Sequence, residues 1–152
     1  MKKVCIYCGS SVGRQSGYAE HARELVRTLA RENIGIVYGG ASVGIMGIIA
    51  DTALELGAEV VGVLPQVLQN KEIIHRGLTE LHLVDSMHSR KAMMVELADG
   101  FIALPGGFGT LDELFETLTW AQLGLHKKPC GLLNIKGYYD DLISFLQKGA
   151  EQ

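Results

Sequence analysis

The amino-acid sequence predicts one doubly wound α/β domain of three layers, in which helices cover both faces of a parallel β-sheet. Three observations support this prediction. Short apolar runs alternate along the chain with longer segments of helical character. Most of these runs are continuously apolar, as expected for parallel strands that are buried on both faces. The length of 152 residues suits one domain with a normal-sized core.

The strand candidates are the apolar runs themselves. In chain order they are KVCIYC at 3–8, IGIVY at 34–38, EVVGVL at 59–64, ELHLV at 80–84, GFIAL at 100–104 and CGLLNI at 130–135. The helix candidates lie between and after them, at 17–32, 44–56, 87–98, 110–124 and 138–148. The longest irregular stretch is 65–79, and loops of that length in a compact domain are often functional.

Composition and charge exclude several classes of protein. Hydrophobic residues make up 47% and charged residues 20% of the chain, which are values of a globular protein. The net charge is −3 and lysine and arginine form no block, so nucleic-acid binding is disfavoured. No apolar run reaches the ~18 residues of a membrane span, and the N-terminal run is too short for a signal peptide. We therefore expect a cytoplasmic protein without a membrane partner.

The three cysteines allow two interpretations. Cys5 and Cys8 form a C-x-x-C pair, which is typical of redox sites. The pair lies on a predicted strand, however, and a reactive thiolate is favoured at the start of a helix. Buried, inert thiols are the favoured interpretation, and the redox pair is the alternative. Cys130 has no second cysteine near it, so a four-ligand zinc site is not predicted and no metal is expected.

Unusual residues follow the predicted strands, where ligands gather in doubly wound folds. They include CGSSVG after the first strand, YGGASVG after the second, Pro65 after the third, DSMHSRK after the fourth and PGGFGT after the fifth. The first loop lacks the G-x-G-x-x-G spacing, and the second strand ends without the acid that binds a dinucleotide ribose. A G-x-x-x-x-G-K-[ST] loop is also absent, so neither a nicotinamide enzyme nor an ATPase is predicted.

The turn PGGFGTLDE after the fifth strand is the best candidate for a phosphate site. Gly106, Gly107 and Gly109 let backbone N–H groups approach an anion without a Cβ in the way. Thr110 can add its hydroxyl, and the following helix directs its positive dipole end to the same place. The same residues also fit a capping box, with Thr110 at the N-cap and Glu113 three positions on. The turn alone does not decide between a monophosphate site and a cap.

The helix SMHSRKAMMVELA adds a second unusual feature. Its apolar face, which includes Met87, Met94 and Ala98, is interrupted by the cations Arg90 and Lys91. Both cations lie in the first turns, where the helix dipole disfavours positive charge. This placement indicates an anionic partner. The alternative is that the side chains bury their stems and extend their charged heads into water.

These two segments carry a resemblance to a known family. SMHSRK followed by PGGFGTLDE resembles the paired signature of the LOG (LONELY GUY) family of cytokinin riboside 5′-monophosphate phosphoribohydrolases. The resemblance extends to YCGSS, YGGASVGIMG and EIIHRGLTELHLVD. It implies a Rossmann-like fold, usually a homodimer, that needs no cofactor. The implied reaction cleaves the N-glycosidic bond of adenine-type nucleoside 5′-monophosphates, cytokinin riboside monophosphate or AMP, to the free base and ribose 5-phosphate.

The resemblance also implies which residues form the site. Arg90 and Glu113 match the catalytic pair. The positions that match substrate contacts are Glu72, Lys91, Gly106, Gly107, Phe108, Gly109, Thr110, Leu111, Asp112 and Thr119. Many relatives have glutamate at the position of Asp112. Family members also carry an older label, putative lysine decarboxylase, for which the sequence offers no pair of a Schiff-base lysine and a partner for the pyridoxal ring nitrogen.

Two further expectations concern the C-terminal region and an alternative function. Family members usually continue past the helix at 138–148 with another strand and helix, so residues 1–152 are expected to lack that C-terminal pair. The alternative function, from a different class, is a non-catalytic protein of the same fold that binds or carries a nucleotide or a phosphorylated cofactor. The combination of Arg90 with Glu113 favours the enzyme, because a phosphate carrier gains nothing from a carboxylate near its anion.

Overall fold

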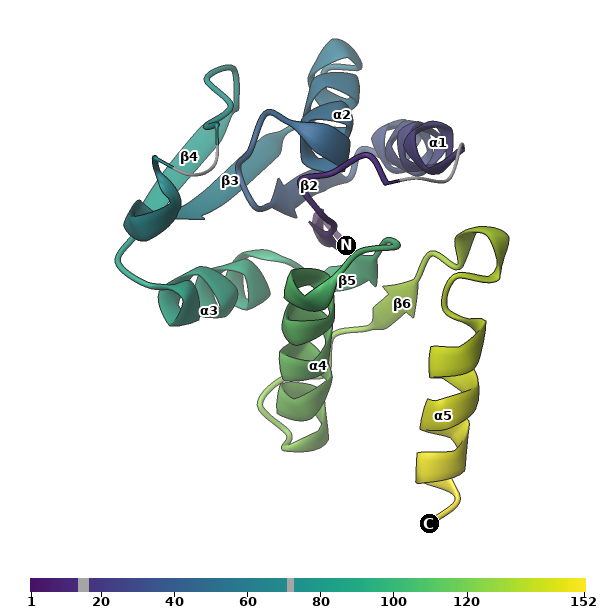
Figure 1. The fold of residues 1–152 in the computed structure, drawn as a ribbon. Coiled ribbons are helices and arrows are strands. Elements are labelled where there is room, and N and C mark those ends of the chain that lie inside the picture. Colours follow the sequence, from purple (N-terminus) through teal and green to yellow (C-terminus); the bar gives the residue numbers. More distant parts are fainter. Residues whose placement is uncertain (14–16, 71–72) are drawn as a thin grey trace.

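A computed structural model describes residues 1–13, 17–70 and 73–152, and its strands form one parallel sheet (Figure 1). The strands are β1 (Lys3–Tyr7), β2 (Gly35–Tyr38), β3 (Val60–Pro65), β4 (Glu80–Val84), β5 (Gly100–Ala103) and β6 (Cys130–Leu132). Their order across the sheet is β4-β3-β2-β1-β5-β6, and every neighbouring pair is parallel. The predicted α/β fold with a parallel sheet is therefore confirmed.

The helices lie where the sequence predicts them. They are α1 (Tyr18–Arg31), α2 (Gly44–Glu55), α3 (Met87–Leu97), α4 (Phe108–Gln122) and α5 (Asp140–Ala150), with short 3₁₀ helices η1 (Gln66–Leu68) and η2 (Ile135–Gly137). The difference that matters for function is at α4, which begins two residues before the predicted start. Within the described ranges, no helix is both long and apolar enough to cross a membrane.

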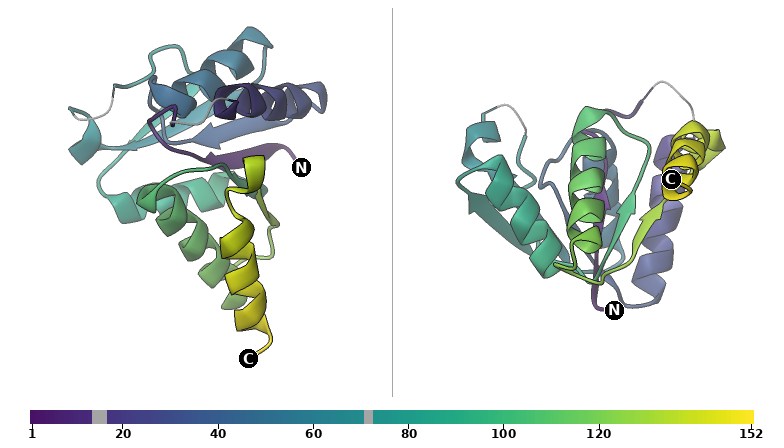
Figure 2. Two further views of the ribbon diagram at one scale, coloured as in Figure 1. Left: turned by 45° about the vertical axis from the view of Figure 1, so that its right-hand side comes forward. Right: turned by 90° about the horizontal axis from the view of Figure 1, so that it is seen from below.

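Helices cover both faces of the sheet. Helices α1 and α2 pack against one face, and α3, α4 and α5 lie on the other side (Figures 1 and 2). The pleat of β1 divides its side chains between the two cores: Val4 and Ile6 pack with α1 and α2, whereas Cys5 and Tyr7 pack with α3 and α4. Burial of β1 on both faces explains why its sequence is continuously apolar.

The strand order creates a topological switch point beside β1. The chain builds outward from β1 through β2 and β3 to β4, and then returns to place β5 on the other side of β1. The residues Tyr7 and Ala103 are paired at the carboxyl ends of these two strands. The loops that follow β1 and β5 leave in opposite directions, and such a crevice is where ligands bind in open α/β sheets.

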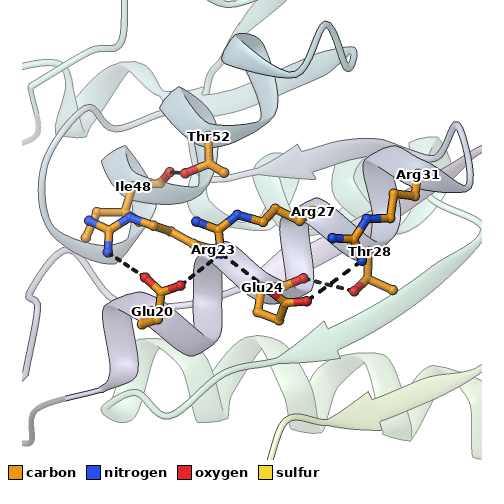
Figure 3. A network of polar contacts seen from close by, with 8 residues as sticks. All are labelled: Glu20, Arg23, Glu24, Arg27, Thr28, Arg31, Ile48 and Thr52. Carbon is orange, nitrogen blue, oxygen red and sulfur yellow. Dashed lines mark hydrogen bonds and ion pairs between the residues drawn. The ribbon is translucent and has the colours of Figure 1, made fainter.

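The outer face of α1 carries a ladder of charges of alternating sign (Figure 3). Glu20 forms ion pairs with Arg27 at 2.8 Å and with Arg23 at 3.4 Å. Glu24 pairs with Arg27 at 3.3 Å and with Arg31 at 3.9 Å. Pairs on an exposed helix contribute a few tenths of a kcal/mol each (~0.2–0.5). This ladder solubilises and supports the helix, and it lies away from the crevice.

Candidate active site

A cavity of about 710 Å³ opens at the switch point. Ligand pockets of proteins typically measure about 300–1,000 Å³. The wall includes the loop 8–13 after β1, Gly39 after β2, and residues 105–107 after β5. Helices contribute more of it: Ile45 and Met46 from α2, Met87 and Arg90 from α3, and Gly109, Thr110, Asp112 and Glu113 from α4. Tyr18, Leu68 and Tyr138 also line the cavity. The segments that follow β1, β2 and β5 thus meet at one site, as the sequence predicts.

The start of α4 excludes the capping box. The helix begins at Phe108 with Gly107 at the N-cap, so Thr110 lies inside the first turn rather than at the cap. Its side chain is buried over Gly106, where an added Cβ would lie 2.2 Å from Thr110 Oγ1. Only glycine fits that close approach. The interpretation of Thr110 and Glu113 as a capping box is therefore wrong, because close packing of Thr110 on Gly106 lets the helix start earlier.

The N-terminus of α4 presents backbone donors to the cavity. The N–H of Leu111 bonds to the Gly107 carbonyl at 3.1 Å, so the N–H groups before it lack an acceptor within the helix. Gly107 supplies no side chain that could cap them. Gly107, Gly109 and Thr110 all line the cavity. This arrangement supports the predicted monophosphate site, since N–H groups and the helix dipole both favour an anion here.

Arg90 lies inside the molecule and does not extend into water. Its side chain is 6% exposed and lines the cavity. Its Nε donates to the Val63 carbonyl at 3.0 Å and its Nη2 to the Gly39 carbonyl at 2.7 Å. A Cβ at position 39 would lie 2.3 Å from Nη2, which explains the glycine at the end of β2. For Arg90, the alternative of a side chain that extends its head into water is wrong.

Glu113 lines the same cavity, and a buried chain of hydroxyl groups holds its backbone. The Thr117 hydroxyl donates to the Glu113 carbonyl at 2.8 Å. The Thr117 Oγ1 atom in turn accepts from the Tyr7 hydroxyl at 2.7 Å, because the Thr117 hydroxyl proton is already used in the bond to Glu113. Tyr7 and Thr117 are both buried. The second turn of α4 is thereby fixed to β1, and with it the position from which the Glu113 side chain leaves.

The charges of both predicted catalytic residues, Arg90 and Glu113, affect the pKa values of the thiols in and after β1. Burial, and next the Glu113 carboxylate, raise the pKa of the Cys8 thiol, while Arg90 acts in the opposite direction. The pKa of Cys5 is raised by the same two causes and lowered by Arg90 to a smaller extent. Cys8 itself lines the cavity. Arg90 and Glu113 therefore act on the same small region, next to the loop that follows β1.

Lys91 faces α4 and is not among the residues that line the cavity. Its Nζ lies 2.7 Å from Glu116 Oε2 and 3.1 Å from Asp112 Oδ2. Hydrogen bonding of the Lys91 ammonium to the carboxylates of Glu116 and Asp112 raises the pKa of Lys91, and burial opposes this effect. The anionic partners that the sequence indicated for this cation belong to the protein itself. The role of Lys91 in substrate binding stays a prediction.

The remaining predicted contacts divide into two groups. Gly106, Gly107, Gly109, Thr110 and Asp112 line the cavity. Outside the lining are Phe108, which is 94% exposed, Leu111, and Thr119, whose hydroxyl donates to the Phe115 carbonyl. Glu72 lies outside the described residues. Sequence reasoning missed Tyr7, Thr117 and Tyr138, because their contacts join segments that are far apart in the chain.

The described residues contain no group of three or more His, Cys, Asp or Glu side chains that could hold a metal ion. Among the residues that line the cavity in the described part of the chain, none is a lysine. Among the described lining residues, a ligand thus meets donors from backbone N–H groups, hydroxyls and one arginine, and acceptors from the carboxylates of Asp112 and Glu113. Such a set can bind an anion and place a negative charge close to it.

Comparisons with known proteins place the chain in a family. A family model described as possible lysine decarboxylase matches residues 46–152. A cytokinin riboside 5′-monophosphate phosphoribohydrolase of Arabidopsis thaliana is 49% identical over 99% of this chain and 71% of its own length. One of the same name from Rhodococcoides fascians is 51% identical over 98% of this chain and 76% of its own. A molybdenum cofactor carrier protein from Chlamydomonas reinhardtii shares the fold at 21% identity, with a TM-score of 0.76 over 97% and 86% of the two chains.

The thiols provide a test of the C-x-x-C alternative. A raised pKa leaves less thiolate at pH 8 than an unperturbed cysteine has, so Cys5 and Cys8 should react slowly with Ellman's reagent in the folded protein. Cys130 is only partly buried, and it is removed with Cys130→Ser. We expect this variant to release almost no colour until it is unfolded, and then two equivalents. Fast reaction of two thiols in the folded variant would support the redox interpretation instead.

Proposed function

This chain belongs to the LOG family of cytokinin riboside 5′-monophosphate phosphoribohydrolases, and from this premise we propose how its cavity works. The chain is an N-glycosyl hydrolase of nucleoside 5′-monophosphates. We propose that residues 1–152 form one nucleotide-binding domain. Its substrates are adenine-type nucleotides, AMP or N6-substituted cytokinin nucleotides, and its products are the free base and ribose 5-phosphate. A cytoplasmic location is part of the proposal, because three free thiols suit a reducing compartment.

One observation carries the catalytic assignment. Arg90 and Glu113 come from different helices, and both line the cavity that also contains the strand-five turn. A planar guanidinium, a carboxylate and a row of backbone donors thereby surround one space. In this arrangement the N–H groups at the start of α4 hold the 5′-phosphate. Gly106, Gly107, Gly109 and Thr110 are the residues that bring the main chain close to it.

Glu113 then acts at the sugar. Loss of the base breaks the bond between C1′ and the purine nitrogen, and the ribose ring becomes positively charged as in other glycoside hydrolyses. The Glu113 carboxylate stabilises that charge. It also either accepts a proton from the water that attacks C1′ or attacks C1′ itself, after which water releases the sugar. Arg90 binds phosphate or ribose oxygens with its planar fork and orients the carboxylate.

The label of lysine decarboxylase does not fit the residues present. A pyridoxal phosphate enzyme needs a lysine that forms a Schiff base with the cofactor. The described residues that line the cavity include no lysine, and Lys91 is engaged by Asp112 and Glu116 instead. The phosphoribohydrolase function requires neither that lysine nor a redox group.

Product analysis tests the function directly. The protein is incubated with AMP, isopentenyladenosine monophosphate and the other purine and pyrimidine monophosphates, and free base and ribose 5-phosphate are measured by chromatography. Stoichiometric release of both products from an adenine-type nucleotide is expected. Binding of the nucleotides without release of base would favour the alternative, a carrier of the same fold.

Glu113→Gln is the sharpest variant for the chemistry. The substitution keeps the size of the side chain and leaves the bond from Thr117 to the Glu113 carbonyl intact, so the fold should be unchanged. We expect turnover of the nucleotide to fall by about 10²–10³ or more, as is usual when a well-placed electrostatic group is lost. The matched control is Glu96→Gln, an exposed acid of α3 outside the cavity. Equal turnover in the two variants would remove Glu113 from the mechanism.

We also propose that the chain forms a homodimer through the exposed face of α4. On this helix Phe108 is 94% exposed and Phe115 is also exposed, and Leu123, the C-cap residue that follows it, is 68% exposed. Several large apolar side chains exposed along one helix are typical of an interface. Phe108 and Thr119 do not line the cavity of their own chain, so a contact of either residue with substrate is most simply made across such an interface.

The double variant Phe115→Asp/Leu123→Asp tests this interface. Two carboxylates placed on the apolar face would lose their hydration on association. Burial of an unpaired charge costs on the order of several kcal/mol, so the dimer should not form. The wild-type chain should sediment at twice the monomer mass at micromolar concentration, and the variant at the monomer mass. A wild-type chain that is monomeric under these conditions contradicts the proposal.

A further inference from the structure

Tyr138 touches the strand-five turn although it lies far from it in the sequence. Its hydroxyl donates to the Gly106 carbonyl at 2.5 Å, and its ring lines the cavity. The side chain is 46% exposed. Tyr138 lies outside PGGFGTLDE and outside the other motifs that carry the family resemblance. A hydroxyl at this place controls a main-chain group of the turn itself.

The position of the Tyr138 ring is fixed by its surroundings. The ring meets Tyr139 edge-on at a centroid distance of 4.9 Å and Tyr18 edge-on at 6.2 Å. The preceding 3₁₀ helix η2 is held by Asn134, whose amide donates to Asp140 and whose carbonyl oxygen accepts from the Tyr139 N–H. The hydroxyl is therefore a rigidly placed donor and not a side chain that happens to reach the turn.

The bond to Gly106 has two consequences for an anion in the turn. A carbonyl oxygen carries partial negative charge and repels an anion, and the Tyr138 hydroxyl covers this oxygen. The Gly106 carbonyl and the Gly107 N–H also belong to one planar trans peptide, so they point in opposite directions. Fixing the carbonyl fixes the N–H. A peptide between two glycines is otherwise less restricted in its rotation than other peptides, because neither residue has a Cβ.

We propose that Tyr138 is a positioning residue of the phosphate site: its hydroxyl holds the Gly106–Gly107 peptide in the orientation that receives the 5′-phosphate before the nucleotide arrives. The inference rests on the proposed function, in that the turn is taken to bind phosphate. It predicts that the hydroxyl contributes to binding of every phosphorylated ligand. It also predicts that the hydroxyl contributes little to ligands without phosphate.

The adjacent tyrosine provides a matched control. Tyr139 makes the same type of bond, from its hydroxyl to the Leu104 carbonyl at 2.5 Å. The peptide that follows Leu104 belongs to Pro105, which has no N–H to direct. Tyr139 is 1% exposed and does not line the cavity, so its bond supports the core alone. Two neighbouring Tyr→Phe substitutions thus remove one hydroxyl each, with different expected effects.

The experiment compares Tyr138→Phe and Tyr139→Phe with the wild-type chain. Binding of ribose 5-phosphate is measured by calorimetry, KM and kcat are measured with AMP, and inhibition is measured with adenosine. For Tyr138→Phe we expect KM for AMP and Kd for ribose 5-phosphate to rise about five- to tenfold, the effect of one hydrogen bond. The inhibition constant of adenosine and the Tm should change little. Tyr139→Phe should lower the Tm and leave KM and Kd unchanged.

Two outcomes overturn the proposal. One is an unchanged Kd for ribose 5-phosphate in Tyr138→Phe. The other is an equal loss of affinity for adenosine and for ribose 5-phosphate, which would indicate that the ring simply shapes the cavity. Failure of the proposed function gives a different result: the wild-type chain then releases no base from AMP, while the calorimetric titration still reports on the turn.

Discussion

The parallel pairing of β1 with β5 is the constraint on which the site depends. The register sets Tyr7 beside Ala103, and the Leu104 N–H continues the ladder with a bond to the Tyr7 carbonyl at 2.9 Å. The two following loops therefore start at the same level and diverge at once, because β2 lies on one side of β1 and β6 on the far side of β5. The cavity is a result of strand order, and the residues in its wall depend on that order for their proximity.

The buried side chain of Arg90 connects this cavity to the segments of β2 and β3. Burial of a single charge in a protein costs on the order of several kcal/mol unless hydrogen bonds compensate it. The carbonyls of Gly39, which follows β2, and of Val63, within β3, provide such bonds. Arg90 thus joins α3 to the carbonyls of Gly39 and Val63, which hold its guanidinium in place in the absence of a ligand. A positive group fixed before binding needs no reorganisation during the reaction, which is the condition for effective electrostatic stabilisation.

Local patterns in the sequence predict the strands and helices. The features that these patterns do not predict depend on contacts between residues far apart in the chain. The apolar runs identify each strand because a strand buried on both faces has to be apolar throughout. The start of α4 is not predictable in this way, since Gly107 and Gly109 have low helix propensity and suggest a turn. Only the packing of Thr110 on Gly106 shows that the helix begins at Phe108. The bond between Tyr7 and Thr117 spans 110 residues and leaves no local signature.

The relation between the turn and Glu113 distinguishes a hydrolase from a carrier on energetic grounds. Thr110 and Glu113 are three positions apart, so they lie on the same face of α4, separated by somewhat less than the ~5.4 Å of one turn. Two unit negative charges about one helical turn (~5.4 Å) apart repel each other by roughly 3 kcal/mol at an effective dielectric constant of 20. A protein that only held a phosphorylated ligand would bind it more weakly for having this carboxylate. In the proposed mechanism the ribose ring becomes cationic between the two groups, so the same carboxylate would attract it, and the energy difference would favour the transition state over the bound substrate. The hydrogen bonds of Thr117 and Tyr7 fix the Glu113 backbone, in the second turn of α4, to β1. The start of the Glu113 side chain is thereby held at the site, although a carboxylate there weakens the binding of an anion.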